Sequence, residues 1–120
     1  MKPTVELRPS WACALAPWGF LILLATVILH LRLGLGRFPR SMWDDYLTPA
    51  FRLHHSVVHA SGVLSALAVP VVWLALQWFP RFRAPTPVFL RQIAVTILGW
   101  AVFFAFAIGD PWRLVSWYLD

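Results

Sequence analysis

Histidine is the residue type in this sequence whose spacing best suits binding chemistry. His55 and His59 have an i, i+4 spacing, which places two imidazoles on one helix face and is used by pairs of metal ligands on a single helix. His30 lies near the end of an earlier apolar segment and reaches a similar depth if both segments are packed helices. The pattern indicates a candidate haem or transition-metal site, held by His30 with His55 or His59 and with Asp44 or Asp45 as further ligands.

A structural role for these histidines is the favoured interpretation. They lie within about two helical turns of the ends of apolar segments, where a neutral imidazole forms hydrogen bonds with headgroups, water or a carbonyl. The chain has no second residue pair with metal-ligand spacing and no known haem-attachment motif. We therefore expect no cofactor, with haem or a transition metal as the alternative.

The acidic residues are poorly arranged for catalysis. Asp44 and Asp45 are adjacent, so in an extended segment their carboxylates point to different sides, whereas acid–base chemistry needs groups that converge on one substrate atom. We expect them to form ion pairs with arginines such as Arg113. Asp110 precedes Pro111, an order typical of a helix N-cap followed by a first-turn proline. The sequence therefore predicts a protein that is not an enzyme.

The composition shows what kind of element must position these residues. Hydrophobic residues make up 60% of the 120-residue chain and charged residues only 12%, whereas about a quarter of an ordinary globular protein is charged. So few charges cannot cover a small soluble domain, and disorder needs the opposite composition. The ten basic residues are spread along the ends of apolar runs, which favours lipid headgroups over nucleic acid as their partner. We predict a membrane protein.

Three runs of the chain contain no Asp, Glu, Lys or Arg: residues 9–31, 53–80 and 92–109. Each run has at least 18 residues, and about 20 helical residues cross a hydrocarbon core. The runs are continuously apolar and do not alternate as barrel strands do. The sequence therefore predicts an all-α integral membrane protein whose residues 1–120 form a single membrane domain. The predicted spans are 11–33, 56–79 and 88–108.

Local signals refine these helices. Ser10 is a candidate N-cap for the first span, Pro17 offers an alternative start, and Gly34 and Gly36 are expected to end it. Pro70 predicts a kink inside the second span. The aromatic tail 111–119 is predicted to form a short interfacial helix.

Three spans place the long connection and the C-terminal tail on the same side of the membrane. That side holds all four histidines and four of the five acids. Basic residues are divided equally between the two sides, so they do not decide the orientation. An uncleaved first helix behind Lys2 and Arg8 favours an N-terminus on the inside.

Small and polar residues at helical spacing predict where the helices pack. Gly62 and Ala66 continue the histidine face of the second span, and small residues at this interval let helices approach closely in lipid. Gln92, Thr96 and Gly99 form a similar stripe on the third span. Aromatic residues occupy the other half of that span and are expected to contact lipid or a partner, with a groove for a quinone or carotenoid ring as the alternative.

Two segments carry a resemblance to known proteins. Residues 36–45 read Gly-Arg-Phe-Pro-Arg-Ser-Met-Trp-Asp-Asp, and residues 110–120 read Asp-Pro-Trp-Arg-Leu-Val-Ser-Trp-Tyr-Leu-Asp. The sequence resembles small polytopic bacterial inner-membrane proteins of unassigned function, in which a Gly-x-x-Pro-Arg loop with paired acids follows the first span. In that group an Asp-Pro…Trp-x-x-Asp tail ends the chain. The resemblance implies a location in the bacterial inner membrane and no particular activity.

These features predict a non-catalytic accessory or assembly subunit of a larger energy-converting or transport complex. Three helices cannot bury an aromatic content of 16% among themselves, so larger membrane subunits or further copies of the chain are the expected partners besides the lipid bilayer. One alternative is a redox protein that binds haem or metal through the histidines. Others are a homo-oligomeric channel or small-solute carrier that uses Gln92 and Thr96, and a membrane enzyme that uses Asp44, Asp45 and His54.

Overall fold

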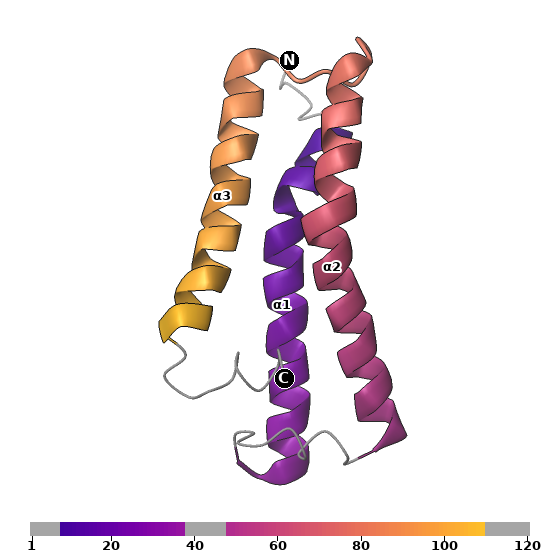
Figure 1. The fold of residues 1–120 in the computed structure, drawn as a ribbon, viewed down its shortest axis with the longest axis vertical. Helices are drawn as coiled ribbons and strands as arrows, with labels where there is room; N and C mark the ends of the chain where they lie inside the picture. Colours follow the sequence, from indigo (N-terminus) through magenta and orange to yellow (C-terminus); the bar gives the residue numbers. More distant parts are fainter. Residues whose placement is uncertain (1–7, 38–47, 110–120) are drawn as a thin grey trace, which may run out of the picture.

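Three long α-helices form the part of the chain that the computed structural model describes, residues 8–37 and 48–109. They are α1 (Pro9–Leu35), α2 (Pro49–Trp78) and α3 (Thr86–Gly109). Figure 1 shows α1 between α2 and α3, with a short loop joining α2 to α3. Each helix is long and apolar enough to cross a membrane. The predictions of an all-helical fold and of three candidate spans are confirmed, whereas the tail helix at 111–119 lies outside the described residues.

The ends of α1 differ partly from the prediction. The helix begins at Pro9, with Arg8 as the N-cap residue, so Ser10 lies inside the first turn and does not cap it. A proline suits this first position because its missing N–H has no intrahelical partner there. Pro17 lies within the continuous helix. The prediction that Gly34 helps to end the helix is wrong, because the helix continues to Leu35. Gly36 follows as the C-cap residue: it has a left-handed backbone (φ 67°), and its N–H donates to the carbonyl of Arg32 at 2.9 Å.

Helix α2 begins earlier than the predicted span, at Pro49 and not near Ser56. Thr48 caps it, because the Phe51 backbone N–H donates to Thr48 Oγ1 at 3.1 Å. The predicted span begins after Arg52 because it was placed within a run free of charged residues. A charged side chain in the first turn does not interrupt a helix, so the helix itself starts before Arg52. The helix also continues through Pro70 to Trp78.

Helix α1 supplies the centre of the core. Its buried residues Phe20, Leu24, Val27 and Leu31 recur at intervals of three and four, which gives one continuous apolar stripe along the helix. Buried side chains of α2, including Phe51 and Val58, pack against this stripe. Helix α3 also packs on α1, so α1 is the element that the other two helices share.

Two glycines mark close helix approaches. A Cβ atom added to Gly62 of α2 would lie 2.6 Å from the ring of Phe20 on α1. A Cβ added to Gly99 of α3 would lie 2.9 Å from Pro17 Cβ and 3.0 Å from Trp18 Nε1. Real Cβ atoms do not approach other atoms so closely, so both positions favour glycine, which has no Cβ. Gly62 and Gly99, one from each predicted small-residue stripe, therefore lie at helix contacts, whereas Ala66 of the α2 stripe is exposed.

Substitution of Gly99 by alanine tests the close approach of α1 and α3. The added methyl group would overlap Pro17 and displace the Trp18 indole. We expect Gly99→Ala to lower the free energy of unfolding by about 1–3 kcal/mol, the usual cost of overpacking. The measurement is the Tm of the purified protein in mild detergent.

The matched control is Gly19→Ala, because no atom lies within 4 Å of a Cβ at that position. Alanine favours a helix more than glycine does, so this variant should keep or raise the Tm. Equal losses in the two variants would contradict the packing described for Gly99.

Candidate functional site

A chain of three hydrogen-bonded side chains joins all three helices, and we call it the Gln92 relay. Gln92 Nε2 donates to Ser10 Oγ at 2.9 Å, and Trp73 Nε1 donates to Gln92 Oε1 in a longer contact of 3.4 Å. Gln92 and Ser10 are 0% exposed. Since hydrocarbon offers no hydrogen bonds, a buried amide must find its partners within the protein. The relay therefore fixes the register of α3 against α1 and α2.

The rest of the predicted stripe on α3 also faces α1. The Thr96 hydroxyl lies 3.1 Å from the carbonyl oxygen of Ala14 on α1 and 2.9 Å from the carbonyl of Gln92 on its own helix. The indole N–H of Trp18 donates to the carbonyl of Val95 at 2.9 Å. With Gly99 against Pro17, the stripe is directed into the α1–α3 interface.

A second polar group, the histidine pair, joins α1 to α2 near the opposite end of the helices. His30 Nδ1 lies 2.9 Å from His54 Nδ1, and Thr26 Oγ1 lies 3.1 Å from His54 Nε2. The Thr26 hydroxyl donates its one hydrogen to the carbonyl of Leu23 at 2.6 Å, so it must accept from His54 Nε2–H. Neutral His54 then accepts at Nδ1, and His30 donates its Nδ1–H. The remaining lone pair of a neutral His30 is on Nε2.

The residue that meets His30 is therefore His54, which the predicted site did not include. His55 and His59 have ring centroids 6.3 Å apart, and the His55 ring stacks on Phe51 at 6.2 Å. His54 shares an i, i+4, i+7, i+11 stripe of α2 with Val58, Ser61 and Ser65, and the structure buries two of these residues, Val58 and Ser65.

Within residues 8–37 and 48–109, no three histidine, cysteine or acidic side chains come together in a way that could hold a metal ion. Every acid of the chain lies outside these ranges, so Asp44, Asp45 and Asp110 cannot be placed, and neither can Arg113. The metal-site prediction for His30, His55 and His59 therefore stays a prediction.

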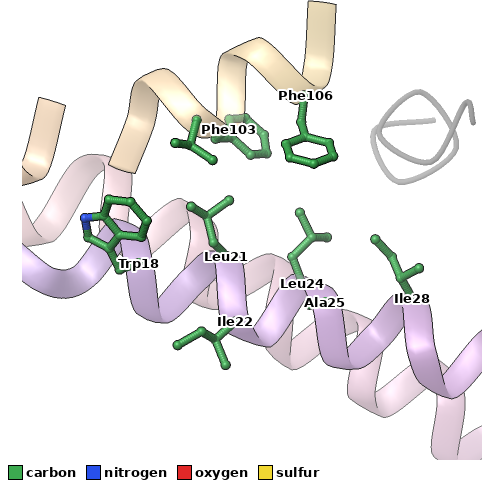
Figure 2. A pocket seen from close by; sticks show the side chains of 9 residues that line it. Trp18, Leu21, Ile22, Leu24, Ala25, Ile28, Phe103 and Phe106 are labelled. Atoms are coloured by element: carbon green, nitrogen blue, oxygen red, sulfur yellow. The ribbon is translucent and has the colours of Figure 1, made fainter. Parts of the chain in front are cut away.

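An apolar cleft of about 370 Å³ separates α1 from the C-terminal half of α3, and we call it the α1/α3 cleft. Figure 2 shows Phe103 and Phe106 of α3 projecting toward Leu21, Leu24 and Ile28 of α1. Figure 1 shows α3 leaning away from α1 toward its yellow end. The bulky rings that follow Gly99 explain this divergence, because they hold the two helices apart where the glycine lets them touch.

A second apolar cleft, the α2/α3 cleft, has a volume of about 260 Å³. Phe20 of α1 forms its floor, Gly62 and Ala66 belong to the α2 wall, and Trp100 and Phe104 belong to the α3 wall. The Phe20 ring packs 6.1 Å from Trp100. His59 also lines this cleft, so it faces a different surface from the histidine pair.

Comparisons with known proteins found no family model, no curated protein and no solved structure that matches this chain.

A double-mutant cycle tests the Gln92 relay. Gln92→Leu leaves the buried Ser10 hydroxyl and the Trp73 indole without their partner, and an unsatisfied buried group costs about 1–3 kcal/mol. We expect Gln92→Leu to lower the unfolding free energy by about this amount in detergent. Ser10→Ala in the Gln92→Leu background should then cost less than Ser10→Ala alone. Additive losses would contradict the hydrogen bond between the two residues.

Proposed function

We propose that this chain is a non-catalytic accessory or assembly subunit of a larger bacterial membrane complex with an energy-converting or transport role. The observation that carries the proposal is the α2/α3 cleft, where two helices pack on α1 and leave an apolar groove between them. The cleft combines small residues on one wall with aromatic rings on the other. Small residues permit close helix approach, and rings supply contact area.

The outer surfaces of the helices support the same proposal. Large apolar side chains remain exposed along α2 and α3, among them Leu67, Val71, Ile97 and Phe104. The polar side chains of the Gln92 relay are instead used to hold the three helices together. The described residues thus offer an apolar surface for lateral docking. Resemblance to bacterial inner-membrane proteins and the basic residues ahead of α1 favour that membrane, with the N-terminus inside.

Filling the α2/α3 cleft tests this proposal. Ala66 is exposed and lines the cleft, so Ala66→Trp should block a docked helix without disturbing the core. We expect native mass spectrometry of the tagged protein, extracted in mild detergent, to show a complex with larger subunits for the wild type. In the variant, the amount of that complex should fall by at least about tenfold, which corresponds to a loss of about 1.4 kcal/mol in binding free energy.

Ala68→Trp is the matched control, because Ala68 is also exposed on α2 but does not line the cleft. It should retain the complex. A wild-type protein that is monomeric in the same extracts, or equal complex formation by both variants, would rule out docking at this cleft.

The histidine pair favours a second candidate function, a redox protein with haem or a transition metal. A metal-ligating histidine usually donates its other ring N–H to an acceptor that orients it, and His30 donates to His54 in this way. His30 Nε2 is then the candidate ligand atom, and His55 on α2 is a further candidate. His59 is also a predicted ligand, but it lines the α2/α3 cleft and faces a different surface. A partner subunit would supply the remaining ligands.

Variants of the pair test this second candidate. His30→Ala should abolish any Soret absorbance or bound metal in protein purified from its own membranes. His54→Ala removes only the orienting group and should weaken metal or haem affinity by about 10–100-fold. A colourless wild-type protein with background metal content would eliminate the candidate.

A further inference from the structure

We draw no further inference here: the strongest candidate, the α1/α3 cleft between the helix α1 and the C-terminal half of α3, is an apolar groove, and nothing in the part of the chain that the structure describes shows what covers it.

Discussion

A side-chain amide in hydrocarbon must find its hydrogen-bond partners within the protein, and Gln92 finds them on both of the other helices. This requirement sets the position of α3 along α1. Thr96 and Gly99 follow Gln92 on the same face of α3. Along the α1–α3 interface, the Gln92 amide contact is therefore followed by the hydroxyl contact of Thr96 and then by the close approach at Gly99. Apolar packing alone has little preference among registers in lipid, because lipid chains are as apolar as leucine.

The two apolar clefts follow from the same arrangement. Beyond Gly99 the side chains that face α1 are aromatic, so the helices separate where the glycine contact ends. On the other side, Gly62 draws α2 toward Phe20 while Trp100 and Phe104 hold α3 away from α2. Both clefts therefore form where a helix contact made by a glycine lies next to bulky aromatic side chains that keep the helices apart.

Much of the fold could be predicted from the sequence, because charge-free runs of membrane-spanning length leave few alternatives to helices. The stripe of Gln92, Thr96 and Gly99 also lies at a helix interface. The prediction erred at helix starts, where Ser10 is used for a contact between helices and not as a cap. It also left His54 out of the candidate metal site, since the importance of His54 depends on partners on another helix, far away in the sequence. Spacing within one helix cannot show such partners.

We propose that the α2/α3 cleft receives another polypeptide, and site-specific photocrosslinking in intact native membranes tests this proposal most directly. A photoreactive amino acid at Ala66 would probe the cleft, and the same group at Ala68 would probe the outer surface of α2. We expect a crosslinked product of one defined mass from Ala66 and only lipid adducts from Ala68. Lipid adducts alone from both positions would contradict it.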